Sequence, residues 1–338
     1  MGQLMQLVDP IMDRAMAPGQ GATKNRTPEK PQYDTDFTTR VIAATGSKAH
    51  PRLAEIMPSL LRHLHDFARE VGLTVAEWAS AIDLINACGK MSDDRRNETQ
   101  LLCDILGLES LVDEITSKKL ATSTTETPSA ILGPFYRNDA PLLPNGSSVV
   151  HNLTPSVPWY NQAVADSAYV TGRVLSCASG GGARTPLRNA IVDVWHTAPN
   201  GLYEQQDTDQ PEMNLRGRFA TDADGRYSLY CLRPVAYPIP DDGPAGQLLA
   251  LLDRHPWRPG HIHFIVSAAG HRSLTTQIFD SRDEYINNDS VFAVKEELIV
   301  KFVPREGDPK AKWALEYDFV LGPMQEEVEE TDQSAAFL

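Results

Sequence analysis

The segment Trp257–His263 (W-R-P-G-H-I-H) places two histidines and one arginine directly before the apolar run Phe264–Val266. Such a run is typical of a buried strand. Side chains alternate between the two faces of a strand, so His261 and His263 are expected to point from the same face. Two neighbouring imidazoles make half of a metal site. Arg258, three residues before His261, is close enough to contact a substrate bound there.

His63 and His65 have the same spacing but a different setting. Apolar residues recur at helical period through 51–71. On a helix, residues two positions apart do not face each other. These two histidines are therefore expected at the surface or boundary of a helix, without a metal.

Composition limits the classes of protein that remain. The chain has 338 residues, 41% of them hydrophobic, and a net charge of −14, which argues against nucleic-acid or anionic-membrane surfaces. We find no apolar run of the roughly 20 residues that a membrane span needs, and no signal-peptide pattern. The four cysteines lack paired spacing, which favours core thiols in a reducing compartment and predicts a cytoplasmic protein.

The order of the periodic patterns predicts an α+β fold. Helical periodicity fills 36–120, where Thr74 and Glu77 have the spacing of a capping box. Near residue 121 short alternating runs replace it, which favours an antiparallel β-sandwich that carries the metal site. The predicted organisation is a flexible arm (1–32), a helical dimerisation domain (33–125), a catalytic β-sandwich (126–323) and an acidic tail (324–338).

Two tyrosines are well placed to complete the metal site. Tyr203 and Tyr237 lie in loops that follow predicted strands. Phenolate is a hard anionic ligand that suits a trivalent ion, and two phenolates with a hydroxide would neutralise Fe(III). A third histidine or a carboxylate would instead make a metallohydrolase or an Fe(II) oxygenase. The residue types alone leave these classes open, together with a non-catalytic sandwich binding module.

Longer motifs narrow this choice. They are Leu132–Tyr136, Val192–His196, Asn214–Arg218, Ala236–Pro238, Asp242–Pro244, Arg258–His263, Thr275–Gln277 and, in the helical half, Arg96–Glu98, Leu106–Leu108 and Leu111–Asp113. In this order they resemble the intradiol ring-cleavage dioxygenases of the catechol/hydroxyquinol 1,2-dioxygenase family. The resemblance extends over roughly residues 36–322.

The resemblance implies a non-haem Fe(III) ion held by Tyr203, Tyr237, His261 and His263. It further implies that O2 cleaves an aromatic diol, catechol and/or hydroxyquinol, to a cis,cis-muconate-type product in aromatic catabolism. Tyr237 would leave the metal and accept a proton from the diol. The helical domain would form a homodimer that can enclose a lipid at its interface.

Further residues receive roles from the same resemblance. Arg258 would stabilise negative charge on the ring, and Gln277 would assist Arg258. The substrate walls would be Pro134, Phe135, Ile239, Pro240 and Val291. Asp113 is a candidate partner for an extra ring hydroxyl.

Two features leave the branch of the family open. The walls resemble the hydroxyquinol-cleaving branch, whereas Trp195–Ala198 and Asn214–Arg216 resemble the catechol-cleaving branch.

Gly260 stands where the family usually has alanine, and we expect it to give the backbone more freedom without loss of a ligand.

Overall fold

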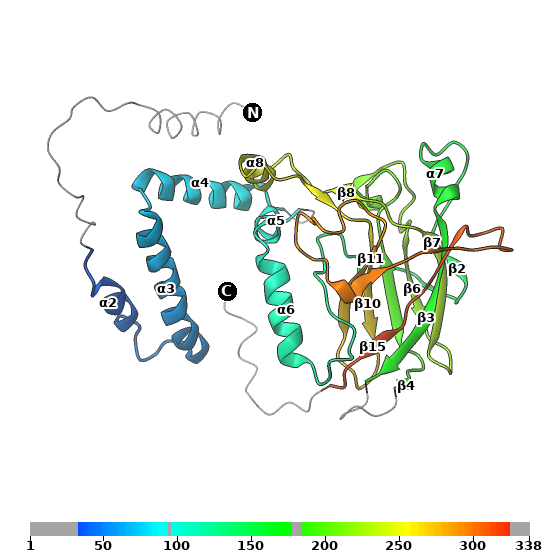
Figure 1. Ribbon diagram of the computed structural model, residues 1–338, viewed down its shortest axis with the longest axis horizontal. Helices are drawn as coiled ribbons and strands as arrows, with labels where there is room; N and C mark the ends of the chain where they lie inside the picture. Colours follow the sequence, from blue (N-terminus) through cyan, green and yellow to red (C-terminus); the bar gives the residue numbers. More distant parts are fainter. Residues whose placement is uncertain (1–32, 94–95, 178–183, 325–338) are drawn as a thin grey trace. The chain divides into compact units, whose positions relative to one another are not determined.

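The computed structural model describes residues 33–93, 96–177 and 184–324 (Figure 1). Residues 87–326 form the larger of two compact units, and most of the smaller unit precedes residue 87. The domain limits expected from composition, with a boundary at residue 125, stay a prediction. The arm expected at 1–32 and nearly all of the tail expected at 324–338 lie outside the described residues.

The smaller unit is helical. It contains α2 (Phe37–Ala43), α3 (Pro51–Val71) and most of α4 (Val75–Met91). Gly72 ends α3 in the left-handed conformation, and the capping box predicted at Thr74 is confirmed, because Thr74 and Glu77 each bond the other's backbone N–H. His63 is exposed, and His65 is half-buried and bonds Thr38, so both lie at the surface or boundary of α3, as predicted.

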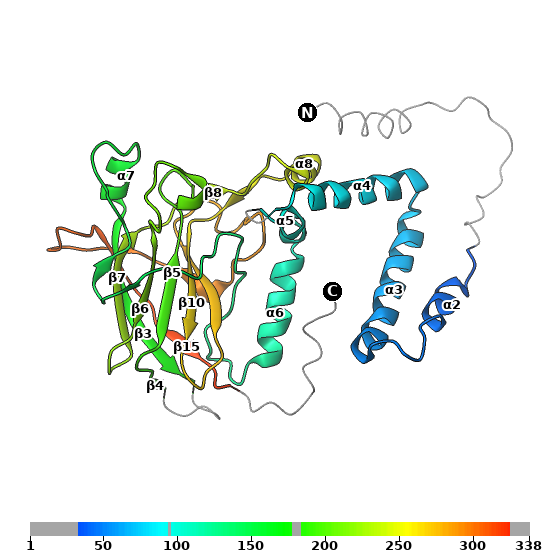
Figure 2. The ribbon, with the colours of Figure 1, turned by 180° about the vertical axis from the view of Figure 1, so that it is seen from behind.

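The larger unit begins with helices and continues as sheets, as the α+β prediction requires. Its helices are α5 (Glu98–Ile105), α6 (Leu108–Leu120), α7 (Tyr160–Ala165) and α8 (Pro244–Leu251), with short 3-10 turns η1 (Glu204–Gln206) and η2 (Glu296–Leu298). Figures 1 and 2 both show α6 beside the sheet that contains β10. No helix of the described ranges is long and apolar enough to cross a bilayer.

Two main sheets build the sandwich. The first has the order β1 (Leu142–Leu143), β6 (Arg216–Ala220), β5 (Ile191–Trp195), β10 (His261–Ser267), β11 (Leu274–Asp280), β12 (Ile299–Val300). The second has the order β13 (Val303–Pro304), β14 (Trp313–Glu316), β3 (Ser167–Ser176), β7 (Arg226–Leu232), β2 (Ser147–Ser148), and β15 (Phe319–Leu321) and β4 (Thr185–Pro186) also pair with β3. A separate ribbon joins β8 (Tyr237–Pro238) to β9 (Trp257–Arg258). The central pairs are antiparallel, and parallel pairs occur at the edges and along β3.

The core of the sandwich determines which face of β10 is free for chemistry. Ile262, Phe264 and Val266 pack into the main hydrophobic cluster with β5 side chains such as Val192 and Val194. The alternate residues of β10 therefore point to the opposite face of the sheet. The strand pattern thus presents the two histidines on the side away from the core.

Several elements differ from the sequence expectation. The alternating pattern of Leu315–Leu321 predicts one strand, but the chain divides there into β14 and β15. The Tyr317 carbonyl accepts a bond from the Tyr227 hydroxyl at 2.8 Å, and Asp318 accepts the Arg173 N–H at 2.7 Å. The apolar residues of Leu111–Ile115 predict one more helical turn, whereas α6 has 13 residues.

Candidate metal centre

The two histidines of β10 lie side by side, as their spacing predicted. Their Nε2 atoms are 3.1 Å apart, and both side chains are buried. Strand β5 flanks β10 on one side and β11 on the other, with Trp195 and Gln277 in register with His263. Two neighbouring strands therefore fix the direction of these side chains.

Tyr203 reaches this site from the turn after β5. Its backbone N–H donates to Gln206 Oε1 at 3.1 Å, and the Gln206 N–H donates to its carbonyl at 2.9 Å. The next residue, buried Glu204, accepts from Arg216 Nε at 2.7 Å. The turn is therefore anchored on both sides of the phenol.

Tyr237 reaches the site from β8, where it pairs with Arg258 of β9. Gly201 has a positive φ of 79°, and a Cβ there would lie 3.2 Å from Tyr237 Cβ. The glycine lets the loop before Tyr203 pack directly against Tyr237. The two tyrosine loops are thus packed on each other.

The four side chains form a closed ring of donor atoms. The Tyr203 hydroxyl is 3.1 Å from His263 Nε2 and 3.4 Å from the Tyr237 hydroxyl, which is 3.5 Å from His261 Nε2. The fourth edge is the 3.1 Å between the two histidine nitrogens. Nitrogen and oxygen ligands bind metal ions at about 2.0–2.2 Å. Ligand atoms on one ion therefore lie about 3 Å apart, which these edges match.

The protonation states of the histidines and of Tyr203 also suit the binding of a metal ion. His261 Nδ1 lies 2.7 Å from the Pro259 carbonyl, which can only accept, so Nδ1 carries the proton and Nε2 is the nitrogen with the lone pair. Burial, and then the charge of Arg258, lower the pKa values of His261 and His263 well below the usual range. Burial, and then the Tyr237 hydroxyl, raise the pKa of Tyr203 well above its usual value. Neutral imidazoles beside phenols can accept a cation that replaces the phenolic protons.

Arg258 lies against this donor ring. Its Nη1 is 3.1 Å from His261 Nε2, and its Nη2 donates to Gln277 Oε1 at 2.9 Å. Gln277 is itself fixed, because its Nε2 donates to the Ile131 carbonyl at 2.7 Å. The structure therefore brings the predicted arginine and glutamine together beside the donors.

Aromatic rings hold two of the donors in place. Trp195 stacks on His263 with centroids 4.7 Å apart, and Phe135 stacks on Tyr203 at 4.6 Å. The run Ala190–Trp195 predicts a strand that ends at Trp195, but this stacking was not predicted. The signal was available, since the neighbouring strand of a sheet presents its side chains to the same face.

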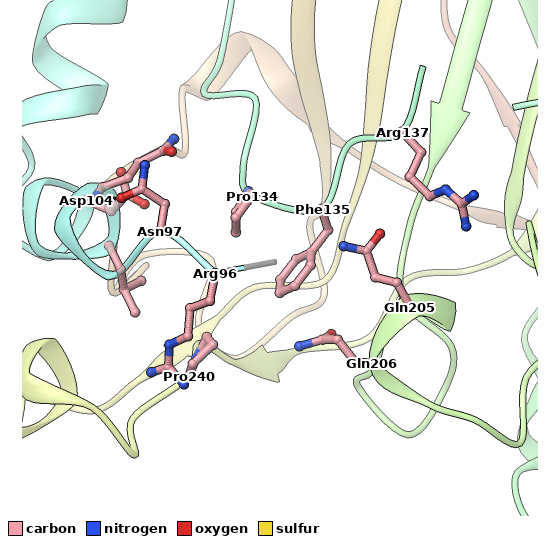
Figure 3. Close-up of a pocket in the computed structure, with 11 residues that line it drawn as sticks. Arg96, Asn97, Asp104, Pro134, Phe135, Arg137, Gln205, Gln206 and Pro240 are labelled. Carbon is pink, nitrogen blue, oxygen red and sulfur yellow. Dashed lines mark hydrogen bonds between the residues drawn. The ribbon is translucent and has the colours of Figure 1, made fainter. Parts of the chain in front are cut away.

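A cleft of about 630 Å³ reaches the metal site through Phe135, which stacks on Tyr203; none of the four donor residues is among its lining residues. Its lining includes three of the predicted walls, namely Pro134, Phe135 and Pro240. Figure 3 shows Phe135 between Asn97 and Asp104 on one side and Gln205 on the other. Ile239 and Val291 are buried but do not belong to this lining.

Asp113, the candidate partner for a ring hydroxyl, is not part of this lining, and its role stays a prediction. Asp113 lies elsewhere, in an ion pair with Lys295 at 2.8 Å. Asp104 instead lines the cleft, and its buried Oδ1 has no hydrogen-bond partner in the described part of the chain. Burial, and then Glu109, raise the pKa of Asp104 to about 9. A neutral carboxyl with a free oxygen can bond a ligand hydroxyl.

Comparisons with known proteins show which chains this one is similar to. Residues 149–323 match the family model described as Dioxygenase, and residues 50–124 match Catechol dioxygenase N terminus. The chain is 46% identical over 291 residues to a catechol 1,2-dioxygenase of Candida albicans, covering 84% of this chain and 91% of that protein. It is 40% identical over 291 residues to a hydroxyquinol 1,2-dioxygenase of a Rhizobium species, covering 83% and 92%. A hydroxyquinol 1,2-dioxygenase structure from Pseudomonas putida superposes with a TM-score of 0.74 and 39% identity, covering 85% of this chain and 97% of that one.

Proposed function

This chain belongs to the intradiol ring-cleavage dioxygenase family, and on that premise we propose that Tyr203, Tyr237, His261 and His263 hold its iron as Fe(III). Enzymes of this family use non-haem iron to cleave catechol-type diols in aromatic catabolism. The observation that supports the ligand set is the ring of four buried donor atoms with edges of 3.1–3.5 Å. Bound there, Fe(III) would hold both diol oxygens and polarise the ring toward attack by O2.

Tyr237 is the group that accepts a diol proton. Its hydroxyl sits at the corner with the two longest edges, 3.4 and 3.5 Å, and is the donor most loosely held by its neighbours. As a phenolate that would hold the metal, Tyr237 would also be a base able to take the proton of an incoming diol hydroxyl. Proton transfer to Tyr237 Oη therefore needs no further residue.

Arg258 stabilises the negative charge that develops on the ring. It is buried, and Nη1 faces the donor ring at 3.1 Å from His261 Nε2. A fixed cation in a water-excluded site acts on the transition state more strongly than one in water. Gln277 holds the guanidinium in this direction.

Flat side chains position the aromatic ring and keep water away. Phe135 packs on the metal-site tyrosine, and Pro134 and Pro240 add rigid apolar surface to the cleft. Such walls suit a planar ring that has few polar contacts. Polar side chains also line the cleft, among them Asn97, Gln205 and Asp104.

The free oxygen of Asp104 favours hydroxyquinol over catechol, and both are accepted. Hydroxyquinol carries a third hydroxyl, which the protonated Asp104 carboxyl can bond. Catechol lacks this hydroxyl, so the free oxygen of Asp104 would stay without a partner. The relatives include both catechol and hydroxyquinol dioxygenases, so the proposed preference for hydroxyquinol rests on Asp104.

The test compares kcat/KM for catechol and hydroxyquinol in the wild type and in Asp104→Leu, with the ring-opened dicarboxylic acid identified by mass spectrometry. One lost hydrogen bond of about 1–1.5 kcal/mol corresponds to roughly tenfold. We expect that loss for hydroxyquinol and less than about threefold for catechol. Equal losses for the two diols would overturn the role of Asp104, and absence of ring-opened product from either diol would overturn the proposed function.

A metallohydrolase or Fe(II) oxygenase would need a carboxylate or a third histidine beside the pair. In this chain the phenols of Tyr237 and Tyr203 lie beside the two histidines instead. In the described part of the chain, no group of three or more His, Cys, Asp and Glu residues is arranged to hold a metal ion. A colourless zinc protein would nevertheless support this alternative, and a metal-free protein would support a binding module.

We also propose that the helices of the smaller unit mediate a cytoplasmic homodimer, with a lipid between the subunits. Large apolar side chains of α3 and α4 are exposed, including Leu64, Phe67, Trp78 and Ile85. Exposed apolar surface of this extent marks an interaction site. Sedimentation analysis tests the dimer, and mass spectrometry of an organic extract tests the lipid.

A further inference from the structure

Asp289 is a buried carboxylate whose two oxygens each make two contacts. Oδ1 accepts from Arg258 Nε at 3.1 Å and from the Val291 N–H at 3.3 Å. Oδ2 accepts from Arg258 Nη2 at 3.3 Å and from the Ala293 N–H at 3.0 Å. The carboxylate therefore joins the guanidinium to the backbone of its own loop.

This pairing fixes the orientation of Arg258. A guanidinium is planar and rigid, so a carboxylate that holds Nε and Nη2 leaves only one direction for Nη1. That direction leads to His261 Nε2, 3.1 Å away. Gln277 contributes one contact, to Nη2, and a single contact does not fix a plane.

We propose that Asp289 is a positioning residue for ring cleavage, which aims Arg258 Nη1 at the reacting ring. The same carboxylate holds the backbone of Val291, a residue that the sequence analysis assigned to the substrate wall. This inference rests on the proposed function, because the role of Arg258 belongs to that reaction. It adds a residue 31 positions from Arg258 in the chain to the machinery of the site.

The test uses the iron-loaded full-length protein and the variant Asp289→Asn, which keeps the shape but loses the charge. We expect kcat to fall by about 10–100-fold, the range found when partners of site residues are removed. KM for the diol and the affinity of the complex formed without O2, followed by its visible spectrum, should change by less than about threefold. A fall in kcat below threefold, or a changed iron spectrum in the resting variant, would overturn the proposal.

The control is Asp280→Asn, which removes another buried carboxylate that pairs with an arginine, Arg233, at 2.6 Å. It should destabilise the protein without lowering kcat. If Asp289→Asn and Asp280→Asn lost equal kcat, general destabilisation would explain both losses, and this result would overturn the positioning role of Asp289.

A double variant separates action through Arg258 from any other role. In the background of Arg258→Met, Asp289→Asn should cost no further activity, because residues that act through one another are not additive. Additive losses would overturn the proposal. A wild-type protein that loads iron but opens no diol ring would overturn the proposed function itself, whereas an active wild type with an equally active Asp289→Asn overturns only the role of Asp289.

Discussion

Replacing Arg258 with methionine should reduce both catalysis and stability, and the two losses have different origins. Methionine fills similar space without charge, so the change removes the guanidinium and leaves Asp289 buried without its cation. Loss of one preorganised electrostatic group typically costs about 10²–10³ in kcat, or about 2.7–4 kcal/mol. We expect this loss in kcat/KM for the diol.

The stability loss follows from the ion pair. Two unit charges about 4 Å apart interact by roughly 4 kcal/mol at an effective dielectric constant of about 20. Breaking a buried pair on one side typically costs about 3–5 kcal/mol, because the remaining charge has no partner. Arg258 and Asp289 are 3.1 Å apart and almost fully buried, so we expect the free energy of unfolding to fall by that amount.

Two assays distinguish these effects. Urea unfolding, followed by tryptophan fluorescence, measures stability, and the ring-opened product measures kcat/KM at saturating iron. Adding Asp289→Asn to Arg258→Met removes the unpaired charge, so stability should recover by at least half while activity stays low. A drop in kcat/KM below about fivefold with an unchanged iron spectrum would refute the role of Arg258, and unchanged stability would refute the importance of its ion pair.

Three further predictions address other parts of the site. Tyr237→Phe should weaken iron binding and slow substrate deprotonation; unchanged visible spectrum and turnover would contradict the assignment. Gly260→Ala should lower stability by about 1–3 kcal/mol and reduce iron content, because an added Cβ would lie 2.8 Å from the Pro234 backbone that leads to Tyr237. Calorimetry measures the stability of this variant, and metal analysis measures its iron content. A melting temperature equal to that of the wild type would contradict the close approach of residue 260 to the Pro234 backbone. Asp104 has a pKa near 9 in the folded protein against 3.8 as its ordinary value, so its contribution to stability is present below about pH 4 and is lost as pH rises toward 9. Asp104→Asn should therefore flatten the unfolding free energy between these pH values, and an unchanged slope would contradict the raised pKa.

Local patterns predicted the elements that carry the site. The alternation of apolar and polar residues in β10 placed His261 and His263 on one face, because strand geometry has a period of two. The extent of α3 followed from its periodicity over 51–71. These features depend on residues close in the chain, so the sequence alone was sufficient.

Contacts between distant residues were harder to predict. Asp289 lies in a loop without periodicity, and only the folded chain brings it to Arg258. Asp113 was a candidate because it belongs to a family motif, and only the folded chain shows its ion pair with Lys295. Gly260 looked like a source of backbone freedom, whereas the structure shows that a close approach to Pro234 requires it. In each case the deciding neighbour comes from a different element.

The visible absorption spectrum of the protein loaded with Fe(III) tests the central claim most directly. Two phenolate ligands, Tyr203 and Tyr237, should give a charge-transfer band that makes the protein wine-red. The donor ring of 3.1–3.5 Å edges predicts this band at one iron per chain. A colourless protein that nevertheless holds one iron per chain would contradict the account.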